Sequence, residues 1–211
     1  VYKRQVDECG EVVDGDQLMS ICGNYMKQKG TLKKNTIVAT VMSNLGMFLM
    51  GEREGIHIEK TKVGDRYVLE NMLENGYNIG GEQSGHIIFL DENTTGDGLL
   101  SALHLLQVMT ETKKKLSELA SIMEVLPQAL VNAKVPNHKK EHFEEYAEIA
   151  EAIAEVEAKF AGEGRVLIRP SGTEPLVRVM IEGKDQQLIE SEAQKLAELI
   201  SSICLLYTSP S

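Results

Sequence analysis

Two short loops hold the residues whose types and spacing are best suited to chemistry. Residues 81–86 read Gly-Glu-Gln-Ser-Gly-His, which places a carboxylate, a hydroxyl and an imidazole among glycines, and residues 169–175 read Arg-Pro-Ser-Gly-Thr-Glu-Pro. A carboxylate can accept hydrogen bonds from two neighbouring sugar hydroxyls, whereas a guanidinium can donate two hydrogen bonds to one phosphate group. The two loops together predict a phosphosugar ligand, although neither contains an obvious nucleophile for phosphoryl transfer.

The 169–175 loop has the composition of a phosphate site. Arginine presents a planar pair of donors, the two hydroxyls add further donors, and the glycine allows successive backbone N–H groups to converge on an anion. A proline and glycine turn capped by an arginine is the alternative, but the consistent chemistry along the loop favours phosphate binding. The predicted phosphate contacts are Arg169, Ser171, Gly172, Thr173 and, shortly after the loop, Arg178.

The 81–86 loop has the composition of a site for a polyol. Glu82 and Ser84 can bind sugar hydroxyls, and the flanking glycines let the backbone approach a ligand closely. His86 can donate to a phosphate, or act as a general acid or base near neutral pH. The alternative is a turn with an exposed glutamate and a histidine satisfied within the core, and the histidine taken alone favours that alternative.

Two further segments combine charged residues with glycine. Asp14 and Asp16 flank a glycine at a predicted helix start, where carboxylates either bind a hard cation or cap the helix, and this position favours capping. Residues 62–66, Lys-Val-Gly-Asp-Arg, precede another predicted helix. There Arg66 can contact a ligand and Asp65 can cap the helix, and the sequence leaves both interpretations open.

The composition excludes several classes of partner. The chain has 211 residues, 26% of them charged, and a formal net charge of −10. That charge argues against binding nucleic acid or an anionic membrane, because both need clustered Lys and Arg. No apolar run approaches the roughly 20 residues of a membrane span, and the residues at the start of the sequence are not those expected of a signal peptide. The 3 cysteines lack metal-ligand spacing, which predicts free thiols in a reducing cytoplasm.

Alternating helix and strand signals predict an α/β domain around the 81–86 loop. A continuous apolar and β-branched run at 36–42 is typical of a strand buried on both faces. Such alternation implies a parallel or mixed sheet flanked by helices. The predicted strands are 36–42, 56–61 and 86–90, and the predicted helices are 17–29, 67–74, 98–112 and 115–123. Asn75 and Gly76 are expected to end the second of these helices.

A change of character near Leu126 predicts a second, smaller domain. Pro127, Pro136 and the basic stretch at 138–140 mark the boundary. Beyond it, an acidic amphipathic helix, two strands that hold the 169–175 loop between them and a closing helix make a small α+β domain. The predicted helices are 141–160 and 186–203, and the predicted strands are 165–169 and 176–182.

The two ends of the chain differ from the rest. Residues 1–5 and 204–211 carry no periodicity and do not continue the patterns beside them. We expect them to be a non-native leader and tail, outside the fold.

Six segments resemble the carboxyl-terminal half of the α-D-phosphohexomutase superfamily, and the resemblance covers nearly all of residues 6–203. They are Val-Asp-Gly-Asp-Gln at 13–17, Thr-Val-Met-Ser-Asn at 40–44, Thr-Lys-Val-Gly-Asp-Arg-Tyr-Val at 61–68, Gly-Gly-Glu-Gln-Ser-Gly-His-Ile-Ile-Phe at 80–89, Asn-Thr-Thr-Gly-Asp-Gly at 93–98 and Arg-Pro-Ser-Gly-Thr-Glu-Pro-Leu-Val-Arg at 169–178. Within the superfamily, Gln83 resembles the glucosamine branch.

The resemblance implies a four-domain enzyme built around one cleft. Its first domain supplies a phosphoserine, its second an aspartate-rich loop for Mg²⁺, its third a sugar loop and its fourth a phosphate loop. Residues 6–15 would be a remnant of the second domain, 16–125 the third and 126–203 the fourth. The implied enzyme is an isomerase, an intramolecular phosphotransferase that interconverts glucosamine 6-phosphate and glucosamine 1-phosphate through a bisphosphorylated intermediate and feeds cell-wall precursor synthesis.

The resemblance also assigns roles residue by residue. Glu82 and Ser84 match the sugar-hydroxyl contacts, and His86 matches a histidine near the transferred phosphate. The residues that match the phosphate loop are Arg169, Ser171, Gly172 and Thr173.

The segments that should carry the serine and the Mg²⁺ loop have no counterpart in this chain, and Asp14 and Asp16 follow that loop, which supports capping. Because phosphoryl transfer depends on both, we expect Mg²⁺ in full-length relatives, none bound here, and no turnover by this chain alone. The alternatives are a mutase for another phosphohexose, such as a phosphomannomutase or phosphoglucomutase, and a non-catalytic phosphosugar-binding module.

Overall fold

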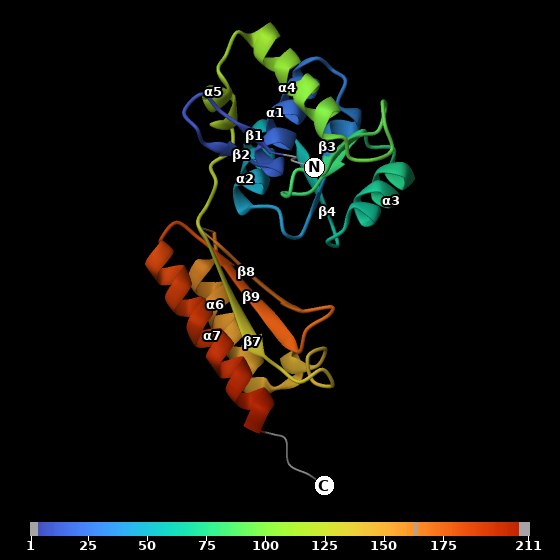
Figure 1. Cartoon of the computed structure of the whole chain (residues 1–211). Coiled ribbons are helices and arrows are strands. Elements are labelled where there is room, and N and C mark those ends of the chain that lie inside the picture. Colours follow the sequence, from blue (N-terminus) through green and yellow to red (C-terminus); the bar gives the residue numbers. More distant parts are fainter. Residues whose placement is uncertain (1–3, 163, 207–211) are drawn as a thin grey trace. The chain divides into compact units, whose positions relative to one another are not determined.

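The buried run that begins at Thr36 forms strand β3 (Thr36–Thr40), a central strand of the first sheet. The structure is a computed structural model that describes residues 4–162 and 164–206. In this structure the chain consists of two compact units, Val1–Val125 and Leu126–Ser211 (Figure 1). The outermost parts of the predicted leader and tail, residues 1–3 and 207–211, lie outside the described residues.

The first unit contains a mixed sheet with the strand order β4-β3-β5-β6. Strand β3 runs parallel to β4 and β5, and β6 runs antiparallel to β5. All five residues of β3 are buried, as expected for a central strand covered on both faces. The other strands are β4 (His57–Thr61), β5 (Ile79–Gly81) and β6 (Ile87–Phe89). The predicted fold class is therefore confirmed.

Helices cover both faces of this sheet. Ile37 and Ala39 point into a large core that is shared with α1, α2, α4 and α5, whereas Val38 points into a smaller core with Val68 and Met72 of α3. This alternation follows from the two-residue period of a strand. The helices are α1 (Gly15–Gln28), α2 (Leu45–Glu54), α3 (Asp65–Asn75), α4 (Gly98–Thr112) and α5 (Leu116–Ala120).

The predicted helix ends are correct at some positions and wrong at others. Asp14 caps α1 in a reciprocal capping box with Gln17, and Gly76 ends α3 with a left-handed backbone (φ 70°). Asp65 is not the N-cap of α3, because that position is Gly64; Asp65 is the first residue of the helix, and its Oδ1 accepts a hydrogen bond from the Arg66 N–H (2.9 Å). Asp16 does not act as a cap either; it is fully buried against the segment after β3.

The first unit begins with a short antiparallel ladder between β1 (Gln5–Val6) and β2 (Val12–Val13). Gln5 lies opposite Val13 in this ladder. The expectation that residues 1–5 stand outside the fold is therefore wrong for Gln5, which pairs with the strand that leads into α1.

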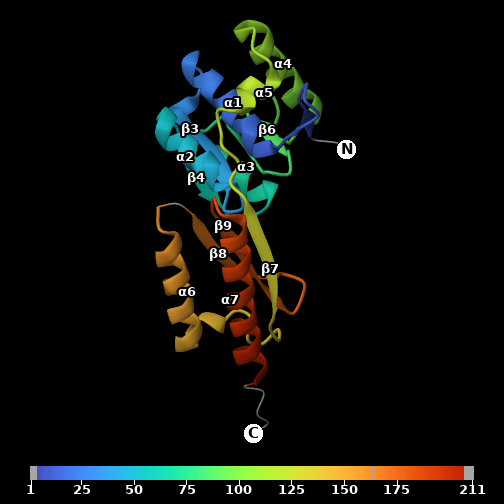
Figure 2. The same ribbon diagram turned by 90° about the vertical axis from the view of Figure 1, so that its left-hand side faces the viewer.

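The second unit is a three-stranded antiparallel sheet with two helices packed on one face (Figure 2). Strand β9 is central, and its Val177, Val179 and Ile181 are fully buried against the helices. The strands are β7 (Gln128–Lys134), β8 (Arg165–Pro170) and β9 (Leu176–Glu182), and the helices are α6 (Ala147–Phe160) and α7 (Gln186–Leu206). A short 3₁₀ turn, η2 (Phe143–Glu145), precedes α6.

Two elements of this unit differ from the sequence predictions. Strand β7 was not predicted, because Pro127 and Pro136 indicated only a boundary, yet both prolines flank the strand and remove no ladder hydrogen bond from it. The helix predicted over 141–160 begins later, since Tyr146 has an extended backbone (ψ 116°) that separates η2 from α6.

The last helix extends beyond its predicted end. Helix α7 continues to Leu206, and Cys204 is fully buried beside Ile200 and Ile203. The expectation that residues 204–211 stand outside the fold is therefore wrong for 204–206, which continue α7. None of the helices in residues 4–162 and 164–206 combines the length and the apolar character that a membrane crossing requires.

A chain that ends at Ile203 should be less stable than one that ends at Leu206. Removing the buried Cys204 leaves a cavity in the second core, which costs about 1 kcal/mol. For a unit of this size that cost lowers the melting temperature by about 4–8 °C. Calorimetry of the two truncated chains measures the difference, and equal melting temperatures would show that Cys204 contributes nothing to the core.

Candidate functional site

The predicted sugar residues gather at the carboxyl edge of the parallel strands. The segments that follow β4 and β5 meet there, because parallel strands end at the same edge of a sheet. The Gly64 N–H donates to Oε1 of Glu82 (3.1 Å), which joins the 62–66 segment to the 81–86 loop. Two of the candidate segments are therefore parts of one surface.

The 81–86 loop is a tight turn between β5 and β6. The Glu82 N–H donates to the His86 carbonyl (3.1 Å), and the Gly85 N–H donates to the Glu82 carbonyl (2.9 Å). Gly85 has a φ of 92°, which side chains rarely adopt, so the turn requires glycine at this position. Ser84 is exposed at the tip, and within the described part of the chain neither its hydroxyl nor Oε2 of Glu82 has a hydrogen-bond partner.

The first residue of α1, Gly15, contacts the backbone of the 81–86 loop. The Gly15 N–H donates to the Gln83 carbonyl (3.0 Å). A Cβ at Gly15 would collide with the Glu82 carbonyl oxygen, so the close approach depends on glycine. Gly15, which follows the capping residue Asp14, thus connects the start of α1 to the backbone of the 81–86 loop.

His86 lies between two partners at the edge of the loop. Its Nε2 accepts a hydrogen bond from the Gly96 N–H (3.2 Å) and lies 3.4 Å from Oδ2 of Asp65. The neutral ring can accept from Gly96, whereas the protonated ring can donate to the carboxylate. The side chain keeps 17% of its exposure, so His86 is satisfied within the protein and still reaches the surface that Glu82 and Ser84 occupy.

Arg66 is directed elsewhere. Its side chain is 81% exposed, and Nε of its guanidinium pairs with Oε1 of Glu70 one turn along α3 (2.7 Å). This hydrogen bond raises the pKa of Arg66. The structure therefore does not bring Arg66 to Glu82, and it places Asp65, its neighbour, next to His86 instead.

The residues described here do not fit a magnesium ion. Asp14 is committed to the helix cap, and Oδ2 of the buried Asp16 accepts a hydrogen bond from the Asn44 N–H (2.7 Å). In residues 4–162 and 164–206, no group of three or more His, Cys, Asp or Glu side chains could hold a metal. A hard cation needs several converging oxygen ligands, and these two carboxylates do not converge.

The 169–175 loop joins β8 to β9 in the second unit. The ladder places Arg169 directly opposite Arg178, and both side chains are partly buried. Burial, and then the charge of Arg178, lower the pKa of Arg169. Like charges placed opposite one another in a ladder are destabilising, and Glu174, 3.2 Å from Nη2 of Arg178, is the carboxylate that partly offsets them.

The loop itself exposes backbone donors. The Ser171 N–H donates to the Leu176 carbonyl (2.9 Å), and Oγ of Ser171 accepts from the Glu174 N–H (3.3 Å), so this buried serine shapes the turn. Gly172 and Thr173 are exposed, and their N–H groups have no hydrogen-bond partner within the described residues. Two N–H groups without a described partner, next in sequence to a pair of guanidiniums, have the donor chemistry that anion binding requires.

One residue of this loop's surroundings was missed by the sequence analysis. Nζ of Lys140 donates to the Ser171 carbonyl (2.6 Å). The sequence signal was the basic stretch at 138–140, which indicated a domain boundary. It could not indicate the contact, because 31 residues separate the two partners.

Family models match both units. The model described as phosphoglucomutase/phosphomannomutase, alpha/beta/alpha domain III, matches residues 14–126, and the model for the C-terminal domain of the same family matches residues 130–199. The chain belongs to the phosphoglucomutase/phosphomannomutase family, and the expected resemblance is confirmed.

The chain is also similar in sequence to individual curated proteins. The chain is 63% identical over 195 residues to a phosphoglucosamine mutase of Ruminiclostridium cellulolyticum and 64% identical to one of Acetivibrio thermocellus. Each match covers 92% of this chain and 43% of the relative, so the chain spans less than half the length of these curated relatives.

Solved structures share the fold. An N-acetylphosphoglucosamine mutase of Aspergillus fumigatus superposes with a TM-score of 0.75 at 17% identity, over 95% of this chain and 46% of that one. Another structure of that enzyme, with a TM-score of 0.73 at 17% identity over the same shares, was solved in complex with GlcNAc-6P and magnesium.

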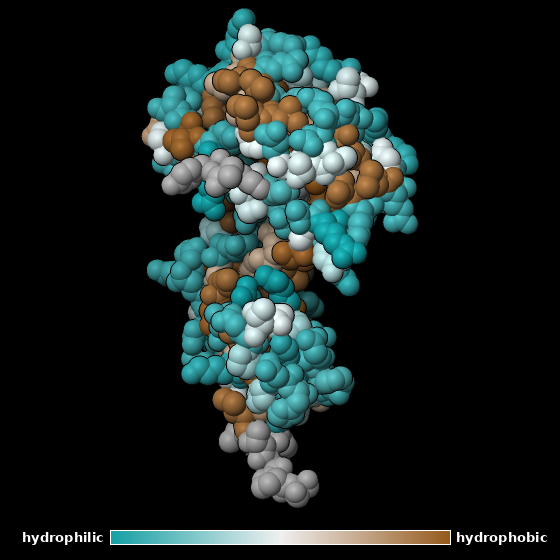
Figure 3. Space-filling view, turned by 45° about the vertical axis from the view of Figure 1, so that its right-hand side comes forward, coloured by the Kyte–Doolittle hydropathy of each residue, from teal (hydrophilic) through white to brown (hydrophobic). Residues whose placement is uncertain are grey.

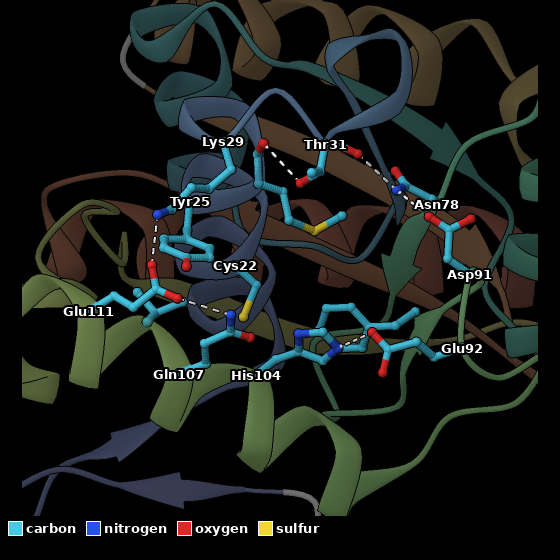
Figure 4. A pocket seen from close by; sticks show the side chains of 13 residues that line it. Cys22, Tyr25, Lys29, Thr31, Asn78, Asp91, Glu92, His104, Gln107 and Glu111 are labelled. Carbon is cyan, nitrogen blue, oxygen red and sulfur yellow. Dashed lines mark hydrogen bonds and ion pairs between the residues drawn. The ribbon is translucent and has the colours of Figure 1, made fainter.

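A hollow in the surface of the first unit is lined by residues outside these loops. It has a volume of about 520 Å³ between α1, α4 and the segment after β6, and its lining includes Thr31 and Asn78, which precede β3 and β5 (Figure 4). It therefore lies at the amino edge of the parallel strands. Its carboxylates are already paired, in Lys29–Glu111 (2.7 Å), His104–Glu92 (2.7 Å) and Asn78–Asp91 (2.8 Å). The hydrogen bond from Lys29 is the main cause that lowers the pKa of Glu111 to about 2.

The cysteines should differ sharply in their reactivity. Burial raises the pKa of Cys22 to about 12 and also raises that of Cys204, whereas Cys9 is exposed. Because the thiolate is the reactive form, alkylation at pH 8 should modify Cys9 alone in the folded chain. Mass spectrometry of the labelled chain measures this, with Cys9→Ser as the control that should remain unlabelled until denaturant is added. Labelling of Cys22 in the folded chain would contradict its burial.

Replacing Gly15 by alanine should move the 81–86 loop. The added Cβ meets the Glu82 carbonyl, so we expect a loss of about 1–3 kcal/mol of stability and shifted amide signals for Gln83 and Ser84. Gly30→Ala is the control, since its Cβ meets nothing within 4 Å and its φ of 71° costs about 1 kcal/mol. Unfolding by denaturant and amide spectra distinguish the two variants. Unchanged loop signals in Gly15→Ala would show that the helix start does not support the loop.

Proposed function

We propose that this chain supplies the sugar-binding and phosphate-binding domains of an isomerase that interconverts glucosamine 6-phosphate and glucosamine 1-phosphate. The observation that carries the proposal is the pair Arg169 and Arg178 beside the free N–H groups of Gly172 and Thr173. A phosphate group matches this arrangement in charge and in donor geometry. The amino-sugar assignment is supported by the high identity to proteins named phosphoglucosamine mutase.

The 81–86 loop would hold the sugar. Oε2 of Glu82 and the hydroxyl of Ser84 have no partner within the described residues, so both can exchange hydrogen bonds with ring hydroxyls. His86 borders the same surface and can donate a proton to a phosphate oxygen when it is protonated. Arg66 could take part only by leaving Glu70.

The remaining parts of the reaction would come from the domains that longer relatives possess. The phosphoserine and the Mg²⁺ ligands belong there, and magnesium would stabilise charge on the transferred group when bound. On α4, Leu99, Leu103 and Leu106 follow a helical spacing and are more than half exposed, and apolar residues also reach the surface elsewhere (Figure 3). Such a stripe can be covered by a neighbouring domain. We propose a reducing cytoplasm as the compartment of the enzyme, and the free thiols of its three cysteines support this proposal.

A chimaeric enzyme tests the proposed reaction. We would join residues 6–206 to the part of the Ruminiclostridium cellulolyticum relative that precedes its matched region. The chimaera should convert glucosamine 6-phosphate and prefer it to mannose 6-phosphate and glucose 6-phosphate, and the chain alone should show no turnover. Preference for a non-amino sugar would favour another phosphohexomutase, and phosphosugar binding without turnover by the chimaera would favour a binding module.

Arg169→Ala should weaken phosphosugar binding by about 2 kcal/mol, because it removes a charge-assisted pair of hydrogen bonds. Calorimetric titration with glucose 1,6-bisphosphate measures the change in the chimaera. Lys184→Ala is the matched control, since it removes one exposed positive charge beyond the opposite end of β9. An equal loss in both variants would mean that net charge, and not the arginine fork, determines the affinity.

A further inference from the structure

The segment between β7 and η2 lies against the 169–175 loop. The Val135 N–H donates to the Pro175 carbonyl (3.1 Å), and Nζ of Lys140 donates to the Ser171 carbonyl (2.6 Å). The segment is itself closed by hydrogen bonds from the Lys139 and Lys140 N–H groups to the Pro136 carbonyl (2.9 and 3.1 Å). The hydrogen-bonded segment 135–140 therefore contacts the 169–175 loop at two places, Ser171 and Pro175.

These contacts determine which backbone groups of the loop remain available. Three carbonyl oxygens of the loop accept hydrogen bonds. The Ser171 carbonyl accepts from Lys140, and the Pro175 carbonyl accepts from the Val135 N–H. The Glu174 carbonyl accepts from the Leu176 N–H (2.9 Å). The N–H groups at the exposed tip engage no described residue. Carbonyl oxygens repel an anion and N–H groups attract one, so an anion site requires this division.

We propose that Lys140 is a positioning residue for phosphate binding. By holding the Ser171 carbonyl, it directs that oxygen away from the ligand and leaves the next two N–H groups, those of Gly172 and Thr173, toward it. Its ammonium also adds positive charge near the arginine pair. The inference rests on the proposed function, because it assumes that the 169–175 loop binds a phosphate group.

The neighbouring lysine makes the same kind of bond to a different element. Nζ of Lys139 donates to the Cys204 carbonyl near the end of α7 (3.0 Å). Lys139 and Lys140 are adjacent, carry the same charge, are both partly buried and each bind one carbonyl. Only the Lys140 bond reaches the 169–175 loop, so Lys139 is a matched control for the loss of charge and for the loss of a lysine–carbonyl bond.

The experiment is a titration of the full chain with inorganic phosphate, followed through the amide signals of Gly172 and Thr173. Lys140→Met should weaken phosphate binding about tenfold and shift the Ser171 carbonyl carbon signal before any phosphate is added. Lys139→Met should change the affinity by less than about twofold while lowering the melting temperature. Lys140→Arg keeps a charged donor and should recover binding to within about threefold of the original chain.

The outcomes separate this inference from the proposed function. If the original chain responds to phosphate and Lys140→Met binds equally well, the inference is overturned and the phosphate site stands. If Lys139→Met weakens binding as much as Lys140→Met does, charge alone explains the effect and the positioning role is wrong. If the original chain does not respond at all, the phosphate site fails and this inference fails with it. Should Lys140→Met not fold, Lys140→Gln replaces it with the same criteria.

Discussion

The register of the β8–β9 ladder is the constraint on which the proposed phosphate site depends. Arg165 lies opposite Glu182 in this ladder, and Arg169 lies opposite Arg178 four residues further along. At the first position the charges are opposite, since Nε of Arg165 donates to the fully buried Glu182 (2.7 Å). At the second position the charges are alike. A shift of one residue would separate both pairs and would turn Val177, Val179 and Ile181 away from the core, so the core fixes the register that places two guanidiniums together.

Keeping two arginines opposite one another has an energetic cost in the absence of an anion. Burial is the main cause that lowers the pKa of Arg169, and the charge of Arg178 is the second cause and the one that reflects the arginine pair. A phosphate placed between the two guanidiniums and the exposed N–H groups would relieve that energetic cost. The proposed site would therefore gain its selectivity for anions from an arrangement that is unfavourable when empty, a pattern that is common where function and stability conflict.

The sequence predicted the elements whose signals are local. The cap at Asp14, the left-handed end at Gly76 and the fully apolar run at Thr36 each act within a few residues. Strand β7 lacked such a signal, since only Ala129 and Ala133 are buried within it and two prolines flank it. Arg66 was a candidate for a ligand contact, because the sequence does not show that its guanidinium pairs with Glu70 one turn further along the helix.

Contacts between distant segments account for the remaining differences. Asp16 with Asn44, Lys140 with Ser171 and Cys204 with the second core all depend on tertiary packing, which no local pattern encodes. Both loops could nevertheless be proposed as candidate sites from the sequence, because the relevant residue types are concentrated in one short segment each, and their binding roles stay predictions. What the sequence could not supply is the support beneath each loop, from Gly15 in the first unit and from Lys140 in the second.

The central proposal is that the 169–175 loop binds phosphate and that the 81–86 loop binds sugar hydroxyls, and a titration of the chain with glucosamine 6-phosphate tests it most directly. Amide signals assigned across residues 4–206 would be followed as the sugar is added. We predict that the largest shifts occur at Gly172 and Thr173, with further shifts at Ser84 and His86. Shifts confined to the hollow between α1 and α4, with both loops unchanged, would contradict the account.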